Sequence, residues 1–230
     1  MFSVYIRTHS ERVHLALQLY SNIEREFKTE TRLLNTGESS ADYTEKFISL
    51  LGDALSQEQN AYILILEDDM LFCSTAYSEI VSAIQYEMPY IWFSIPHNDI
   101  LENSAPLCAN FRQSYIKNNL YYSGSILIQA SLLRAFLRVY VEQSRQLGLR
   151  NFDVNLSKFL IREIGHNMFF CASQFGTDPS IKSSISNNNL IKQDTRFEGQ
   201  ALCDPLFDVS RAIFRYREDN IQDVEKRKFE

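Results

Sequence analysis

Glycine is scarce in this chain, and its few positions exclude two common nucleotide-binding loops. The 230 residues contain 7 glycines, and no two of them stand two positions apart. A G-x-G-x-x-G dinucleotide loop is therefore absent, and so is the G-x-x-x-x-G-K-[ST] phosphate loop, because both need closely spaced glycines. If the protein binds a nucleotide, it does so with other groups.

Cysteine pairs, leader-like segments and long apolar runs are missing as well. The 4 cysteines are scattered without a C-x-x-C pair, which is typical of reduced thiols in a cytosolic protein. No run of about 18 uncharged apolar residues occurs, so we expect no membrane span. The first residues read as a strand rather than as a targeting peptide. We therefore expect a cytoplasmic protein, in a bacterium or in the host cell of a virus.

The composition that is present is typical of a globular domain. Hydrophobic residues make up 45% of the chain and charged residues 23%. The formal net charge of −6 disfavours unspecific binding to nucleic acid or anionic lipid. The length predicts one domain over residues 1–218, followed by a charged tail over residues 219–230.

Short apolar runs alternate with amphipathic segments along the chain. Strands are expected over residues 2–6, 31–34, 61–66, 90–95, 120–129 and 168–171. A T-x-x-E capping box at Thr8 and Glu11 predicts that the first helix begins there. Further helices are expected over residues 41–57, 77–88, 132–146 and 154–164. The polar segment 174–200 reads as a long loop. This alternation predicts an α/β domain with a mostly parallel central sheet flanked by helices, whose ligands bind at the carboxyl ends of strands.

The strongest chemical signal is the triplet Glu67-Asp68-Asp69, which directly follows a continuous apolar run. Carboxylates this close repel each other unless a cation holds them. Mg²⁺ or Mn²⁺ commonly bridges one or two protein carboxylates to the phosphates of a substrate. A metal site is therefore the favoured interpretation. The alternative is a solvated acidic turn that caps the following helix.

Other candidates follow the first strand or open a later helix. Arg7, Thr8 and Arg12 frame the turn after the first strand, where amides and arginines suit an anion. Helix capping and surface arginines are the alternative there. Asp153 opens a helix, either as a structural first-turn acid or as a general base. His9 is expected on the surface, and none of the 4 histidines has metal-ligand spacing with another.

The order of these motifs resembles the GT-A glycosyltransferases, and most of all the branch of N-acetylglucosaminyltransferase IV. Ile65–Asp69 looks like the family's apolar strand ending in an E-D-D form of the DxD motif. Tyr121–Ser125 resembles its aromatic-glycine acceptor segment, and Phe152–Leu156 resembles its P-x-D-W-L helix start. Ser173–Gly176, with Ser183 downstream, resembles its Q-H-x-G … S-S segment.

Two positions depart from the family pattern. Gln174 or Phe175 stands where the family has a histidine, so a histidine metal ligand is not expected there. Asn155 stands in place of the tryptophan of the helix-start motif.

The resemblance implies that a hexosyl or N-acetylhexosaminyl group moves from a nucleotide-sugar to an acceptor hydroxyl, with inversion at the anomeric carbon. A UDP-sugar is the favoured donor. It implies that Asp69 and Asp68 hold Mn²⁺ or Mg²⁺ and that Asp153 is the catalytic base. The implied donor-binding residues are Arg7, Thr8, Arg12, Glu67, Asp68, Gly124, Gln174, Gly176 and Ser183. The acceptor, a glycan, a protein or a modified nucleic acid, stays open. The alternatives are a metal-dependent nucleotidyl- or phosphotransferase and a non-catalytic α/β nucleotide-binding protein.

Overall fold

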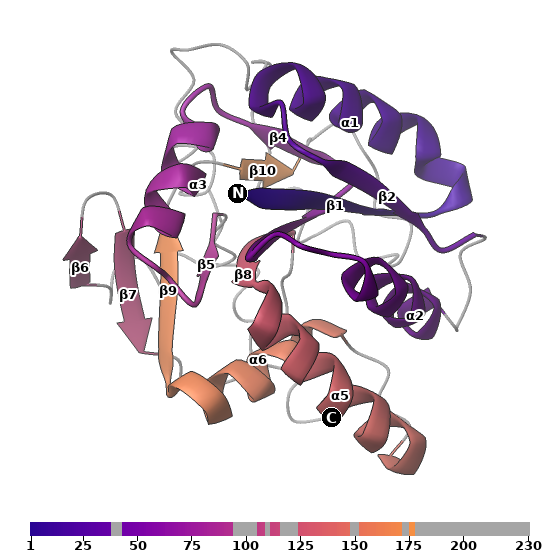
Figure 1. Cartoon of the computed structure of the whole chain (residues 1–230), viewed down its shortest axis with the longest axis vertical. Helices are drawn as coiled ribbons and strands as arrows, with labels where there is room; N and C mark the ends of the chain where they lie inside the picture. Colours follow the sequence, from indigo (N-terminus) through magenta and orange to yellow (C-terminus); the bar gives the residue numbers. More distant parts are fainter. Residues whose placement is uncertain are drawn as a thin grey trace, which may run out of the picture.

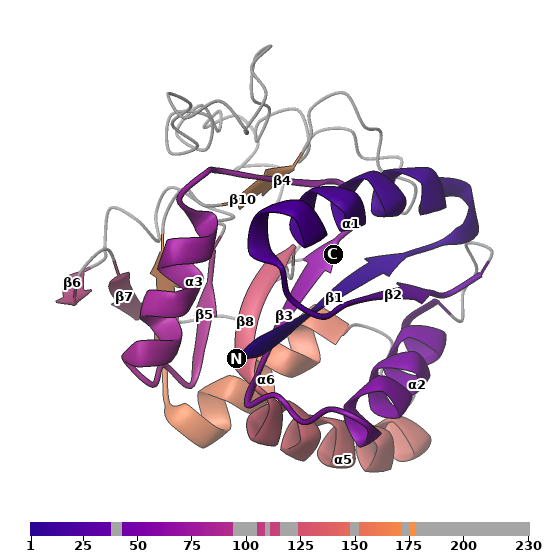
Figure 2. The same cartoon turned by 45° about the horizontal axis from the view of Figure 1, so that its top comes forward.

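A large mixed sheet organises the residues that the computed structural model describes, which are 1–37, 43–93, 105–108, 111–115, 124–147, 152–171 and 175–177. Within these ranges the sheet consists of β1 (Phe2–Thr8), β2 (Thr31–Asn35), β3 (Tyr62–Glu67), β5 (Tyr90–Trp92), β6 (Ala105–Cys108), β7 (Phe111–Tyr115), β8 (Ser125–Gln129) and β9 (Asn167–Cys171). The strand order is β2-β1-β3-β8-β5-β9-β7-β6 (Figure 1, with β3 labelled in Figure 2). A second sheet pairs β4 (Met70–Phe72) with β10 (Phe175–Thr177).

The strands of the large sheet run mostly in one direction. β2, β1, β3, β5, β9 and β6 point one way, whereas β8 and β7 point the other way. The predicted α/β architecture, a central sheet flanked by helices, is confirmed, and the sheet is mixed because β8 and β7 run against the other six strands. The apolar pattern does not predict the two reversed strands, because a buried run of residues carries no information about strand direction.

Helices cover both faces of this sheet (Figure 1 and Figure 2). One face packs against α1 (Val13–Phe27) and α3 (Ala76–Gln85), and the other against α2 (Tyr43–Ser56), α5 (Ala130–Leu147) and α6 (Phe152–Ile164). Consecutive residues of β3 point to alternate layers, with Ile63 and Ile65 in the core on the α2 side and Leu64 and Leu66 in the core on the α1 side. Burial on both faces explains the continuous apolar run of this strand.

Two local predictions are wrong. Thr8 and Glu11 do not form a capping box, because Thr8 still belongs to β1 and a short 3-10 helix, Ser10–Arg12, precedes α1. The expected loop 174–200 contains a strand at its start, since β10 pairs antiparallel with β4. The rest of that segment lies outside the described residues, as do the predicted boundary at 218 and the charged tail.

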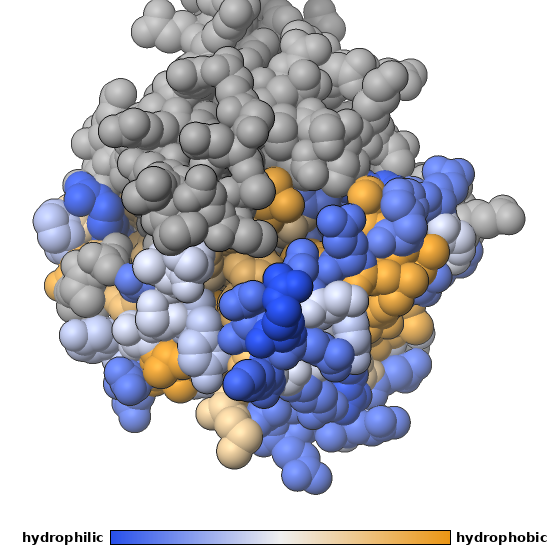
Figure 3. Space-filling model, turned by 90° about the horizontal axis from the view of Figure 1, so that it is seen from above, coloured by the Kyte–Doolittle hydropathy of each residue, from blue (hydrophilic) through white to orange (hydrophobic). Residues whose placement is uncertain are grey.

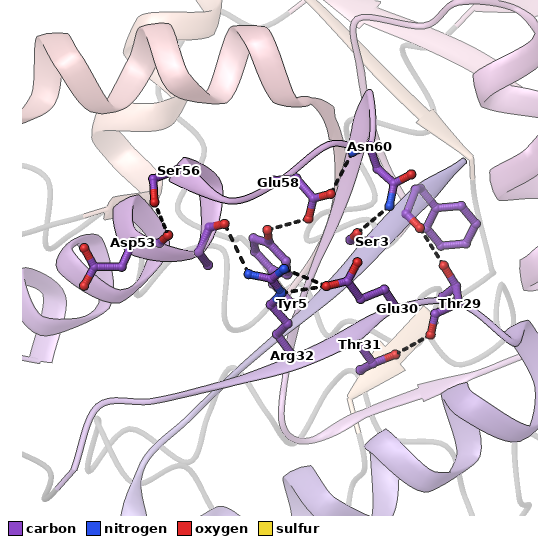
Figure 4. A network of polar contacts seen from close by, with 12 residues as sticks. Ser3, Tyr5, Thr29, Glu30, Thr31, Arg32, Asp53, Ser56, Glu58 and Asn60 are labelled. Carbon is purple, nitrogen blue, oxygen red and sulfur yellow. Dashed lines mark hydrogen bonds and ion pairs between the residues drawn. The ribbon is translucent and has the colours of Figure 1, made fainter.

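A polar network at the amino end of β3 connects this strand with β1 (Figure 4). The hydroxyl of Tyr5 donates a 2.6 Å hydrogen bond to Glu58 Oε2, and Glu58 Oε1 accepts a 2.7 Å bond from the amide of Asn60. The side-chain amide of Asn60 donates a 2.8 Å bond to Ser3 Oγ. Burial raises the pKa of the Tyr5 hydroxyl, and the bond to Glu58 raises it further. These bonds stabilise the register between β1 and β3. The same register places the carboxyl ends of the two strands, where the candidate site lies, side by side.

Large apolar side chains at the described surface are few. They are Met1, Leu17, Tyr77, Tyr86, Leu107 and Val141. Figure 3 shows hydrophilic residues over most of the described surface on one face, with apolar areas between them. Of the helices described, none has the length and apolar content that a membrane crossing requires.

Candidate active site

The β1–β3 pairing places the end of the first strand beside the acidic triplet. Arg7 and Glu67 are direct register partners on the two parallel strands. The carbonyl of Thr8 accepts a 3.0 Å hydrogen bond from the amide of Thr36, just beyond β2. The amide of Glu67 donates a 3.0 Å bond to the carbonyl of Gly124, just before β8. The carboxyl ends of β1, β2 and β3 therefore meet at one edge, where open α/β sheets bind their ligands.

Arg7 is the centre of the first of two arginine–carboxylate clusters. Its Nη1 lies 3.9 Å from Glu67 Oε1 and 3.8 Å from Oδ1 of Asp153, in the first turn of α6. Its Nε donates a 2.8 Å hydrogen bond to the hydroxyl of Tyr43. The guanidinium also lies over the rings of Tyr43 and Phe47, 4.7 and 4.9 Å from their centroids. Arg7 thus brings Asp153 to the same end of the sheet as Glu67.

Arg12, at the start of α1, is the centre of the second cluster. Its Nη2 lies 2.7 Å from Asp68 Oδ1 and 2.8 Å from Asp69 Oδ2, so two carboxylates converge on one nitrogen. The other oxygen of Asp68 accepts a 2.8 Å hydrogen bond from the hydroxyl of Thr8. The two aspartate side chains are only 4% and 0% exposed. Asp69 follows the end of β3, as the apolar run before it predicts, but its side chain is buried beside a cation.

The six charged groups of the two clusters carry more negative than positive charge. Four carboxylates face two guanidinium groups. Burial raises the pKa of the Asp68 carboxyl above its ordinary value, although Arg12 and the bond from Thr8 act against this rise. Burial alone would lower the pKa of Arg12, but Asp69 and Asp68 raise it above its ordinary value. A further cation would therefore be favoured at this edge.

The carboxylate pair suits a hard divalent ion whose coordination is completed by a substrate. Within the part of the chain that the structure describes, no three His, Cys, Asp or Glu side chains are grouped as ready metal ligands. Asp68 and Asp69 nevertheless present two oxygens to one cationic position. Mg²⁺ commonly takes one or two carboxylates from a protein and its other ligands from phosphates and water. The residues fit such an ion, provided that the Arg12 side chain moves aside.

The structure brings together most of the residues that the sequence analysis predicts for the site. Those that meet at this edge are Arg7, Thr8, Arg12, Glu67, Asp68, Asp69 and Asp153. Gly124 adjoins them through its bond from the amide of Glu67. Gly176 is in β10 and pairs with Leu71, two residues after Asp69. Gln174 and Ser183 lie outside the described residues.

The alternative interpretation of the acidic triplet as a helix cap is wrong. β4 begins at Met70, directly after the triplet, and α3 begins only at Ala76. Thr75 is the N-cap residue of that helix, and its side chain makes no capping hydrogen bond. The triplet therefore ends β3 and connects it with β4.

Three residues of this edge escape the sequence analysis. Phe47 is a buried core residue of α2 and Tyr43, one turn earlier, is half-buried, and helical periodicity does not distinguish either from other residues of that helix. His9 is predicted at the surface but is 2% exposed, with its ring edge-on to Tyr43 at 6.3 Å. The connection between β1 and α1 folds inward here, as the amide of Ser10 donates a 2.8 Å bond to the carbonyl of Gly37. No local sequence signal would have revealed these contacts.

Comparison with known proteins finds similar structures but no similar sequences. No protein-family model matches the chain, and no curated protein sequence matches it. One similar structure is described as a glucose-1-phosphate thymidylyltransferase of Bacillus anthracis. It has a TM-score of 0.47 and 11% identity, and the match covers 88% of this chain and 99% of that one.

Two further structures show the range of enzymes that are similar. A glycosyltransferase involved in glycosylation of the major capsid of PBCV-1 has a TM-score of 0.43 and 12% identity, covering 93% of this chain and 98% of its own. A 4-diphosphocytidyl-2C-methyl-D-erythritol synthase of Anaerococcus prevotii has a TM-score of 0.44 and 8% identity, covering 84% and 94%. The similar structures thus include glycosyltransferases and nucleotidyltransferases, at TM-scores too low to carry an argument about this chain. They do not point to the N-acetylglucosaminyltransferase IV branch, which stays a prediction.

Proposed function

We propose that the protein is a metal-dependent glycosyltransferase that uses a nucleotide-sugar donor and inverts the anomeric configuration. The observation that supports this proposal best is the convergence of Asp68 and Asp69 on one cationic nitrogen, at the strand edge where Asp153 also lies. The pair of aspartates offers a position for a cation that faces a diphosphate. Asp153 offers a separate carboxylate for the acceptor.

The donor would bind at the carboxyl ends of β1 and β3. Asp69 and Asp68 would hold Mn²⁺ or Mg²⁺, and an ion bound there would neutralise charge on the diphosphate leaving group. Thr8 and Arg12, which both contact Asp68, lie next to this position. A UDP-sugar is the favoured donor. The remaining residues of the proposed donor site are Arg7, Glu67, Gly124, Gln174, Gly176 and Ser183.

Asp153 would act as the general base. Its carboxylate takes the proton of the acceptor hydroxyl while the hydroxyl oxygen bonds to the anomeric carbon. The bond between that carbon and the diphosphate oxygen breaks, and the electron pair leaves with the nucleoside diphosphate. Attack opposite the leaving group inverts the anomeric centre. Arg7, 3.8 Å away, holds the Asp153 carboxylate in place.

A nucleotidyl- or phosphotransferase remains the alternative enzyme, because it would use the same carboxylate pair. The two reactions differ in the bond that breaks. Sugar transfer from a UDP-sugar releases UDP, whereas nucleotidyl transfer from a nucleoside triphosphate to a sugar 1-phosphate releases pyrophosphate. The acceptor would be a glycan, a protein or a modified nucleic acid, and the sugar a hexosyl or N-acetylhexosaminyl group.

Calorimetry followed by a product assay tests the proposal. UDP should bind with Mn²⁺ and bind only weakly with EDTA, because the carboxylates repel a diphosphate unless a cation lies between them. A panel of nucleotide-sugars should then show release of the nucleoside diphosphate. Equal UDP affinity with EDTA and with Mn²⁺ would overturn the metal requirement. Release of pyrophosphate from a triphosphate and a sugar 1-phosphate would establish the alternative enzyme instead.

A further inference from the structure

The guanidinium of Arg12 occupies the point on which Asp68 and Asp69 converge. We propose that Arg12 is an internal counter-ion, which neutralises this carboxylate pair in the ligand-free protein and releases it to a divalent cation when a diphosphate binds. This role rests on the proposed function, because it concerns the same two carboxylates. It adds that the metal binds weakly alone and that the diphosphate increases its affinity.

The backbone around Arg12 is held in place, so any movement would involve the side chain. The amide of Arg12 donates a 2.9 Å hydrogen bond to the carbonyl of His9, and Ser10 is bonded to Gly37. Gly37 has a φ of +80°, a conformation that favours glycine, and its amide donates a 2.9 Å bond to Asn35 Oδ1. The connection between β1 and α1 is therefore tied to the turn after β2.

Among the described residues, the Arg12 side chain is held, in contrast, at one nitrogen. Both ion pairs that join it to the aspartates involve Nη2. Its Nε is buried without a hydrogen-bond partner among the described residues. Of the contacts with described residues, moving the guanidinium away from the aspartates would break those at a single atom, and a phosphate could replace them with a charge-assisted, bidentate contact.

The side chain of Arg7, in the same site, is held by contacts other than those with its carboxylate partners. Its Nε is bonded to Tyr43, and its guanidinium lies over the rings of Tyr43 and Phe47. Its carboxylate partners are more distant, at 3.8 and 3.9 Å. Arg7 is thus held by its aromatic neighbours, whereas Arg12 is held by the carboxylates that a metal would take. Of these two arginines, it is Arg12 that would compete directly with the metal.

Electrostatics explains why such a counter-ion couples metal binding to diphosphate binding. Without a cation the adjacent carboxylates of Asp68 and Asp69 would repel each other inside the protein. A metal that binds alone must displace Arg12 and separate the guanidinium from the two aspartates that neutralise it. A diphosphate supplies that anion, so each ligand strengthens the binding of the other.

The test measures Mn²⁺ binding directly, from the electron paramagnetic resonance signal of the free ion. It compares wild type with Arg12→Gln and Arg12→Lys, with and without UDP. Arg25→Gln is the matched control, since Arg25 is a 63% exposed arginine on the same helix. Without UDP, Arg12→Gln should bind Mn²⁺ roughly 10- to 100-fold more tightly than wild type, because no guanidinium competes. Arg12→Lys should lie between them, and Arg25→Gln should match wild type.

UDP should increase the Mn²⁺ affinity of wild type by a larger factor than that of Arg12→Gln. Equal Mn²⁺ affinity of wild type and a folded Arg12→Gln variant, while wild type binds Mn²⁺ with UDP, would overturn the counter-ion role alone. If Arg12→Gln does not fold, the same comparison with Arg12→Lys decides. Failure of wild type to bind Mn²⁺ even with UDP would overturn the proposed function and this role together.

Discussion

The hydroxyl of Thr8 donates a 2.8 Å hydrogen bond to Asp68 Oδ2 across 60 positions of sequence. Thr8 ends β1 and Asp68 follows β3, so the bond joins the carboxyl ends of two parallel strands. Both residues are buried. The bond leaves the second oxygen of Asp68 directed at Arg12 and thereby orients the carboxylate pair.

Thr8→Val should weaken Mn²⁺-dependent UDP binding, because Asp68 loses the donor that orients it. It should also lower the free energy of unfolding by about 1–3 kcal/mol, since a buried carboxylate oxygen loses its hydrogen bond. Calorimetry and urea unfolding measure the two effects. Thr36→Val is the control, because the buried hydroxyl of Thr36 donates a 3.2 Å bond to a backbone carbonyl, that of Thr8, and not to the carboxylate of Asp68. An equal loss of UDP binding in both variants would contradict the role of Thr8.

Asp153→Asn should lower the rate of sugar transfer by roughly 100- to 10,000-fold and leave the affinity for the donor nearly unchanged. The amide cannot accept the acceptor proton, but it preserves the shape of the side chain. Glu163→Gln, at a 42% exposed carboxylate on the same helix, should keep full activity. Steady-state kinetics with separate donor and acceptor titrations gives the measurement. Retention of the anomeric configuration in the product would argue against a single opposed base.

Arg7→Met should destabilise the fold by about 3 kcal/mol, because Glu67 and Asp153 would lose the buried cation that faces them both. The stacking on Tyr43 would be lost as well. Arg25→Met removes an exposed ion pair with Glu26 and should cost less than about 1 kcal/mol. Urea unfolding compares the two variants. A similar small cost for both would show that the Arg7 cluster contributes little to stability.

Stability should fall at alkaline pH through Tyr5. In the unfolded chain tyrosine ionises near its ordinary pKa of about 10, whereas burial and the bond to Glu58 keep the folded Tyr5 protonated well above that value. The unfolded state then binds fewer protons than the folded state, so the free energy of unfolding decreases as the pH rises above about 10.

Urea unfolding at pH 8 and pH 11 measures this decrease. It should be smaller in Tyr5→Phe than in wild type, because the variant has no hydroxyl to ionise at this position. Tyr77→Phe, at a residue that is 42% exposed, should match wild type. A decrease of the same size in all three proteins would exclude Tyr5 as its source.

Local sequence patterns determine much of this molecule. The apolar run before Glu67 has to be a strand buried on both faces, since six consecutive apolar residues suit neither an exposed strand nor an amphipathic helix. A triplet of acids directly after such a strand has to lie at a strand end. The helical spacing of apolar residues likewise predicts α2, α3, α5 and α6 to within a few residues.

The tertiary structure alone decides which groups face each other at the strand end. Arg12 reaches between Asp68 and Asp69 only because the connection after β1 folds inward onto the turn after β2. Arg7 meets Asp153 only because α6 packs on the same face of the sheet as α2. These ion pairs join residues that are 56, 57 and 146 positions apart, and periodicity within one segment does not encode them. The pairing of each carboxylate with its cation is therefore a property of strand register and helix packing, and it determines where a metal, a donor and a base could act.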